Sequence, residues 1–167
     1  MRPWNPVPVG ALDPGETLRL LLIDLAILVA LAILIGFVAP RCPDRWFSRD
    51  IGPLRLTRWD RVTLYRRVGI RWFAKWLPEG GSWLGGESKS NLFGSDADSL
   101  RAYLIEVRRG EWVHFLSAFT FLVIVPFNPW QLIVLWFLIV GVGNMVFFLV
   151  LRYNQVRLTS LLARMTR

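Results

Sequence analysis

Three long apolar runs, separated by polar segments, set the pattern of this chain. Residues 18–38 and 132–151 are each about twenty residues long, roughly the helix length that crosses a ~30 Å hydrocarbon core. Residues 112–127 form a shorter run of about sixteen residues, which must borrow helical turns from its polar N-terminal flank or tilt little. The pattern predicts an all-α integral membrane protein with three transmembrane helices.

Turn and cap signals mark the ends of these runs. Asp13-Pro14-Gly15-Glu16 is typical of a helix start, with Asp13 as N-cap and Pro14 in the first turn. Asp96 or Asp98 is expected to cap a helix that begins near Leu100 and continues into the second run. The short turn at Asn128 folds the third run back on the second.

The distribution of charge predicts the orientation. Of the twenty Lys and Arg residues, fourteen lie between Arg41 and Arg109 and four follow residue 151. The positive-inside rule places both of these segments in the cytoplasm and the N-terminus outside. The expected segments are an external N-terminus (1–17), a first span (18–38), a cytoplasmic interfacial region (39–110), a second span (111–127), an external turn (128–131), a third span (132–151) and a cytoplasmic tail (152–167).

The composition is typical of a membrane protein, and the membrane in turn explains the high positive charge. Hydrophobic residues make up 54% of the chain, which carries nine Trp and a net charge of +8. Basic residues that face anionic lipid headgroups account for this charge, so nucleic-acid binding is not expected. Asp24 lies well inside the first span, where we interpret it as a buried hydrogen-bonding residue in preference to a proton relay.

The interfacial region mixes aromatic and basic residues. Between Leu54 and Leu77 the two kinds alternate, which suits one or two helices lying at headgroup level, with two short helices favoured. A glycine-rich stretch with Lys89 follows at residues 77–89. Its paired glycines would let backbone amides approach a phosphate, although an ordinary flexible loop explains them too.

The polar sequence before the second span carries the candidate chemistry. Glu111 and His114 are three residues apart and share a helix face, and Glu106 and Arg109 repeat the spacing one turn earlier. A carboxylate beside an imidazole fixes its tautomer and raises its basicity, as a general base for a hydroxyl nucleophile requires. A polar pair at the membrane boundary is the structural alternative. His114 is the sole histidine, so a di-metal centre is not expected.

A second polar cluster follows the third span. Arg152, Tyr153, Asn154 and Arg157 lie there, and the hairpin brings them to the same membrane surface as His114. Asn154 and Arg157 would hold a phosphate or a sugar hydroxyl opposite His114, within about 10 Å of it. Snorkelling arginines and an interfacial tyrosine explain part of the cluster equally well.

These blocks resemble the glycosyl-4,4'-diaponeurosporenoate acyltransferases, small bacterial membrane proteins of carotenoid synthesis. The resemblance rests on Glu106-x-x-Arg109-x-Glu111-x-x-His114 and Arg152-Tyr153-Asn154-x-x-Arg157-Leu158, supported by Arg41-x-Pro43-Asp44-x-x-Phe47 and Trp72-x-x-Lys75-x-Leu77. It implies a multi-pass enzyme of the bacterial cytoplasmic membrane whose active site faces the cytoplasm.

The resemblance also implies a reaction and its partners. A fatty acyl group would pass from a thioester donor, acyl-CoA or acyl carrier protein, to a hydroxyl of a glycosylated carotenoid or related glycolipid among the membrane lipids. No further cofactor or metal is expected. The catalytic residues would be His114, Glu111 and Glu106, and the substrate-binding residues Arg109, Arg152, Tyr153, Asn154, Arg157, Lys75 and Lys89.

Two other interpretations compete with this one. A non-catalytic membrane subunit that scaffolds lipid or carotenoid enzymes would tolerate loss of His114. A different membrane transferase or oxidoreductase would use the same pocket for a nucleotide cofactor.

Overall fold

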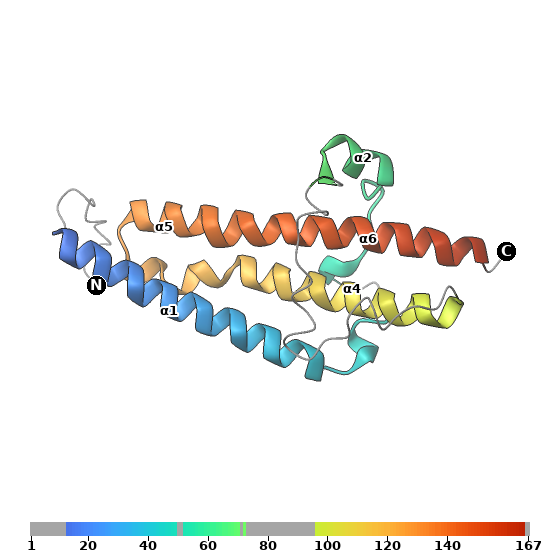
Figure 1. The fold of residues 1–167 in the computed structure, drawn as a ribbon, viewed down its shortest axis with the longest axis horizontal. Helices are drawn as coiled ribbons and strands as arrows, with labels where there is room; N and C mark the ends of the chain where they lie inside the picture. Colours follow the sequence, from blue (N-terminus) through green and yellow to red (C-terminus); the bar gives the residue numbers. More distant parts are fainter. Residues whose placement is uncertain (1–12, 50–51, 71, 73–95, 166–167) are drawn as a thin grey trace.

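The computed structural model describes residues 13–49, 52–70, 72 and 96–165. In this part of the chain every regular element is helical, and the long helices form an elongated bundle (Figure 1). Helix α1 spans Pro14–Val38 and helix α4 spans Ala97–Ala118. A nearly unbroken helix then runs through α5 (Trp130–Trp136), the π-helical η9 (Phe137–Val142) and α6 (Gly143–Met165).

Three of these helical stretches are long and apolar enough to cross a membrane: Pro14–Arg41, Ala97–Phe127 and Trp130–Met165. The predicted all-α class with three spans is thereby confirmed. Large apolar side chains on α1 point outward and stay exposed, among them Leu18, Leu22 and Ile33 at 55% or more. Such a surface belongs against lipid tails, because it is far more apolar than a water-facing helix.

The second span borrows helix from its polar flank, as its short apolar run requires. Asp96 is the N-cap of α4, and its side chain accepts a hydrogen bond from the Ser99 backbone N–H at 3.1 Å. After Ala118 the chain tightens into the 3₁₀ turns η7 (Thr120–Val123) and η8 (Val125–Phe127) before the turn at Asn128. Asp13 stands at the N-cap of α1 as predicted, but its side chain makes no capping hydrogen bond.

Helices α4 and α6 run antiparallel, and small residues let them approach closely. A Cβ added at Gly110 would lie 3.0 Å from a methyl of Leu151, and one at Gly141 would lie 3.5 Å from the Ala118 carbonyl oxygen. A larger side chain at Gly110 would have to displace Leu151, and small residues act in this way at transmembrane helix contacts.

At the end of the bundle that holds the Asn128 turn, α1 is tied to the hairpin through Asp24. Its carboxylate accepts hydrogen bonds from Asn128 Nδ2 and Trp136 Nε1, each at 2.9 Å. Asp24 is 2% exposed. The expectation of a buried hydrogen-bonding residue is confirmed, and the bonds explain how a carboxyl group is accommodated inside an apolar span.

The opposite end of the bundle, which we call the loop end, carries the described part of the segment between α1 and α4. It contains the 3₁₀ turns η2 (Ala39–Arg41), η3 (Asp44–Trp46) and η4 (Gly52–Leu54) and the short helix α2 (Val62–Arg67). Helix α2 lies beside α6 (Figure 1). One of the two expected short helices is thus present, whereas residues 73–77 lie outside the described residues.

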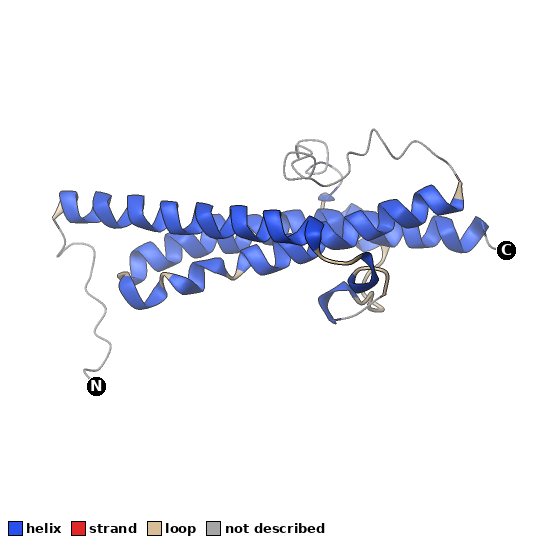
Figure 2. Cartoon of the chain, turned by 90° about the horizontal axis from the view of Figure 1, so that it is seen from below, coloured by secondary structure: helices blue, strands red, loops and turns tan. Residues whose placement is uncertain are grey.

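Both α4 and α6 extend past the end of α1 at the loop end (Figures 1 and 2). The polar blocks of the sequence lie near the level where α1 ends, so the candidate site has to be sought there.

Candidate functional site

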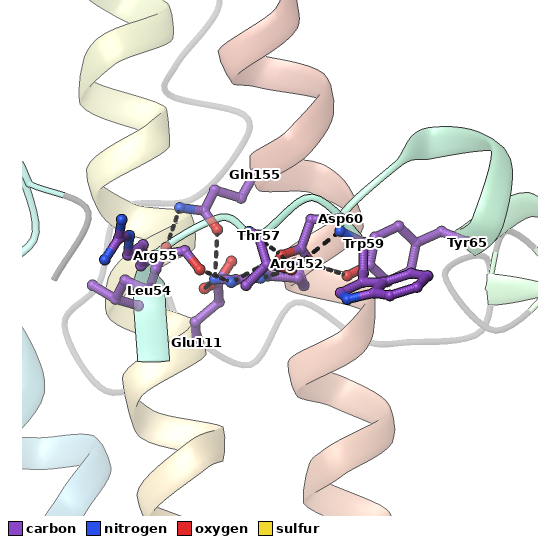
Figure 3. A network of polar contacts seen from close by, with 9 residues as sticks. All are labelled: Leu54, Arg55, Thr57, Trp59, Asp60, Tyr65, Glu111, Arg152 and Gln155. Atoms are coloured by element: carbon purple, nitrogen blue, oxygen red, sulfur yellow. Dashed lines mark hydrogen bonds and ion pairs between the residues drawn. The ribbon is translucent and has the colours of Figure 1, made fainter. Parts of the chain in front are cut away.

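Arg152 of α6 is the centre of a polar network at the loop end (Figure 3). Its Nη1 donates to Glu111 Oε2 of α4 at 3.2 Å and to Gln155 Oε1 at 3.0 Å. Its Nη2 donates to the carbonyl oxygen of Arg55, and Gln155 Nε2 donates to the carbonyl oxygen of Leu54 at 3.0 Å. One guanidinium group therefore joins α4, α6 and the segment that leads to α2.

Asp60 supplies the second carboxylate of this network. It accepts from Arg152 Nε at 3.2 Å, from the Tyr65 hydroxyl at 2.5 Å and from the Thr57 backbone N–H at 2.6 Å. Burial by itself raises the pKa of Asp60, but these hydrogen bonds outweigh it and lower the pKa to about 2. The carboxylate is ionised at neutral pH and balances the charge of Arg152.

The inner part of the network is closed to solvent, whereas Asp60 is half-buried and Thr57 is exposed. Glu111 and Gln155 are 0% exposed, and Arg152 is 5% exposed. A substrate phosphate or oxyanion cannot reach the guanidinium group without displacing Asp60 or Glu111. The geometry therefore gives Arg152 and Glu111 a structural role, that of holding residues 54–65 against the α4–α6 hairpin. We refer to Arg152, Glu111, Gln155, Asp60, Tyr65 and Thr57 as the Arg152 network.

The predicted contact between Glu111 and His114 is not formed. Glu111 bonds to Arg152, and its second oxygen, Oε1, is buried without a hydrogen-bond partner. The spacing does put both residues on neighbouring parts of α4. Glu111, however, faces α6, where it pairs with the guanidinium group of Arg152. His114 points elsewhere and takes a partner from the opposite helix.

His114 pairs with Asn144 of α6. His114 Nδ1 lies 2.9 Å from Asn144 Oδ1, and Asn144 Nδ2 donates to the Val140 carbonyl oxygen at 2.9 Å. Because a carbonyl only accepts, the amide nitrogen must face Val140 and the amide oxygen must face the imidazole. Nδ1 therefore carries the proton, and Nε2 keeps its lone pair.

The surroundings of His114 are aromatic. Its ring stacks on Phe147, with centroids 4.8 Å apart and planes 13° from parallel. The ring is half-buried, unlike Glu111. Asn144 lies two residues after the π-helical η9, and π-helical turns are frequent at functional sites because they reposition the residues beside them. Sequence reasoning missed Asn144, although an amide in the middle of an apolar span is itself a signal.

Arg109 and Glu106, also expected in the site, form a second structural contact. Arg109 pairs with Glu106 of its own helix and with Asp44 at 2.5 Å, and its Cζ lies 5.1 Å from the centre of the Phe47 ring. Arg108 donates to the Phe47 and Ser48 carbonyl oxygens at 3.2 and 3.0 Å. Both arginines hold residues 44–48 against α4.

The remaining residues that the sequence predicted to bind substrate differ in their exposure to solvent. Tyr153 is buried against Tyr65, with ring centroids 6.2 Å apart, whereas Arg157 is exposed and its Cζ lies 5.6 Å from the Tyr153 ring. Asn154 is half-buried. No hydrogen bond or ion pair joins it to His114, and both residues lie in the described ranges. Lys75 and Lys89 lie outside the described residues.

The helix register separates His114 from Asn154. Gly110 lies against Leu151, and His114 lies against Phe147, so Asn154 stands level with residue 107. Seven residues of α4 correspond to about 10 Å along the helix axis. The hairpin thus brings both polar blocks to one end of the bundle, but it does not merge them into one constellation. Among the described residues, no cluster of three or more His, Cys, Asp or Glu side chains is placed to hold a metal.

Comparison with known families bears on this arrangement. The profile of the CrtO family, described as glycosyl-4,4'-diaponeurosporenoate acyltransferase, matches residues 43–164. The chain belongs to this family. The match covers α4, α6, the Arg152 network and the His114–Asn144 pair, and the family name makes the protein an acyltransferase of carotenoid biosynthesis. Comparisons with curated proteins and with solved structures gave no match.

Proposed function

We propose that this acyltransferase acts as an O-acyltransferase with His114 as general base. Nε2 removes the proton of a sugar hydroxyl on a glycosylated carotenoid or related glycolipid. The oxygen then attacks the carbonyl carbon of a fatty acyl thioester, and the tetrahedral intermediate collapses with loss of the thiolate. The proton held on Nε2 passes to the departing sulfur, so the imidazole ends as it began.

The hydrogen bond between His114 and Asn144 carries this proposal. A general base needs a free lone pair on a defined nitrogen, and the bond to Asn144 reserves Nδ1 for the proton. The stacked Phe147 ring restricts the imidazole further. Asn144 thereby takes the orienting role that the sequence predicted for Glu111, and it does so as a neutral group inside an apolar span.

The exposure of each arginine indicates which of them could bind the acyl thioester donor. Arg109 and Arg152 are buried and paired with carboxylates. Arg157 is exposed one turn beyond Tyr153, so it is the better candidate for the phosphates of acyl-CoA or the acidic surface of an acyl carrier protein. The excess of cations at the loop end supports a cytoplasmic orientation for that end, in the bacterial cytoplasmic membrane.

The deciding experiment replaces His114 with Gln, which keeps a polar side chain of similar reach but cannot take a proton. We expect acyl transfer to fall by roughly 10²- to 10⁴-fold, while the protein inserts and purifies normally. The reaction is followed by mass spectrometry of acylated product in membranes. Near-normal turnover would remove His114 from catalysis and leave the scaffold interpretation as an explanation of the site.

A further inference from the structure

A basic groove lies on α2 and the residues just before it. Its volume is about 440 Å³. Three of its lining residues are arginines and one is a tryptophan, and the full lining is Arg58, Trp59, Arg61, Thr63, Leu64 and Arg67. The acyl-transfer proposal does not use this groove, and Arg152 does not line it.

The positive charge of the groove is not neutralised within the described residues. None of Arg58, Arg61 and Arg67 forms an ion pair there, and all three are exposed. Asp60 is the single acidic residue of segment 52–70, which holds five arginines. Its carboxylate is bound by Arg152 and Tyr65 and forms no ion pair with these cations. The groove therefore presents an excess of positive charge, which favours an anionic ligand.

The groove sits at the polar end of a transmembrane span. Helix α2 packs on α6 through Tyr65 and Tyr153, and Tyr153 directly follows Arg152 at the end of the apolar run 132–151. Apolar side chains of the same region remain exposed, with Trp59 at 68%, Leu64 at 44% and Val68 at 62%. Exposed tryptophan and leucine beside arginine fit the headgroup layer of a bilayer, where rings and guanidinium groups both find partners.

We propose that this groove binds the phosphate headgroup of an anionic membrane phospholipid. The planar guanidinium groups of Arg58, Arg61 and Arg67 would bind the phosphate oxygens in paired hydrogen bonds. Trp59 would lie beside the headgroup, with the guanidinium of Arg58 already 5.3 Å from its ring centre. A lipid is favoured over a soluble phosphate compound because Trp59, Leu64 and Val68 are exposed beside the same cations. The proposal is independent of His114.

The test measures lipid binding by the full-length protein in detergent. Native mass spectrometry compares phosphatidylglycerol with phosphatidylcholine for the wild type and for the triple variant R58Q/R61Q/R67Q. Each cation near an anionic lipid contributes about fivefold, so the triple variant should bind phosphatidylglycerol roughly 100-fold more weakly, with phosphatidylcholine binding unchanged. The matched control is R45Q/R49Q/R164Q, which removes the same charge from exposed positions outside the groove.

Several outcomes would overturn the assignment. Equal losses in the two triple variants would mean that net charge alone attracts the lipid. Competition of inorganic phosphate or coenzyme A with phosphatidylglycerol, at comparable concentration, would assign the groove to a soluble phosphate compound. Should the triple variant fail to purify, the three single variants are measured instead, each with an expected loss of about fivefold. Single variants that all bind like the wild type would refute the site.

Discussion

Two polar clusters stand about one helical turn apart on α4 and share the same partner helix, yet they differ in almost every physical respect. The Arg152 network is charged, buried at its centre and connected to three segments of the chain. The His114–Asn144 pair is neutral and half-buried, and among the described residues its hydrogen bonds join α4 only to α6 and the adjoining η9. A buried cluster of paired charges mainly stabilises the fold, whereas a neutral pair that leaves one imidazole lone pair uncommitted is equipped for chemistry.

The difference also shows how a membrane enzyme separates the two tasks. Charged groups are expensive inside a bilayer, so the carboxylates and the guanidinium lie at the end of the spans, where they fasten residues 54–65 to the hairpin. One turn further into the span, a neutral amide is a less costly way to orient an imidazole than a carboxylate would be. This is a physical reason for Asn144, in place of Glu111, as the partner of His114.

The largest expected effect concerns the network. Arg152→Ala leaves the buried Glu111 and the half-buried Asp60 without their cation, and breaking a buried pair costs about 3–5 kcal/mol of stability. Thermal unfolding in detergent measures the loss. Arg157→Ala, five residues later and exposed, is the matched control and is expected to change stability by about 0.5 kcal/mol or less.

The opposite pattern would break the comparison between the clusters. If Arg152→Ala unfolded like the wild type but lost acyl transfer, Arg152 would be a substrate-binding residue, as the sequence first indicated, and the network would open during the reaction.

A smaller effect on stability is expected from the protonation of Asp60 at low pH. Its pKa is lowered from 3.8 to about 2 in the folded protein, so its contribution is fully present above pH 4 and is lost as the pH falls from about 4 to about 2. Because solvent screens this half-buried carboxylate, the expected loss is about 2 kcal/mol at most. Unfolding in detergent at pH 5 and at pH 2.5 measures it. The same measurement on Asp60→Asn gives the pH dependence without this carboxylate, and the difference between the two proteins isolates its contribution. If the free energy of unfolding changed equally with pH in both proteins, Asp60 would not hold the network.

The sequence predicted features that depend on local pattern. Apolar run lengths predicted three spans, the turn at Asn128 predicted the hairpin, and Asp96 was one of two expected caps for α4. The burial of Asp24 followed from the cost of a carboxyl group in hydrocarbon. Each of these properties is fixed by neighbours along the chain or by the solvent around it.

The partners of the polar residues were not predictable in the same way. Asp60 meets Arg152 across 92 residues, and Asn144 meets His114 across 30. Spacing along α4 correctly grouped Glu111 with His114 on the helix, but the rotation of α4 against α6 decides which of them faces Arg152. That rotation depends on the packing of Gly110 on Leu151 and of Gly141 on Ala118, which no pattern of period 3.6 encodes.

The smallest expected effect is a change in kcat on replacing Asn144 in the His114–Asn144 pair. Asn144→Leu removes the acceptor for Nδ1, so the imidazole loses its fixed tautomer and kcat should fall about tenfold, with KM and thermal stability little changed. Gly143→Ala is the matched control, because a Cβ at that position meets open space. Asn144→Asp retains an acceptor oxygen and should recover part of the lost kcat. A loss confined to stability, or a rise in KM with constant kcat, would make Asn144 a packing residue and leave the orientation of His114 to Phe147 alone.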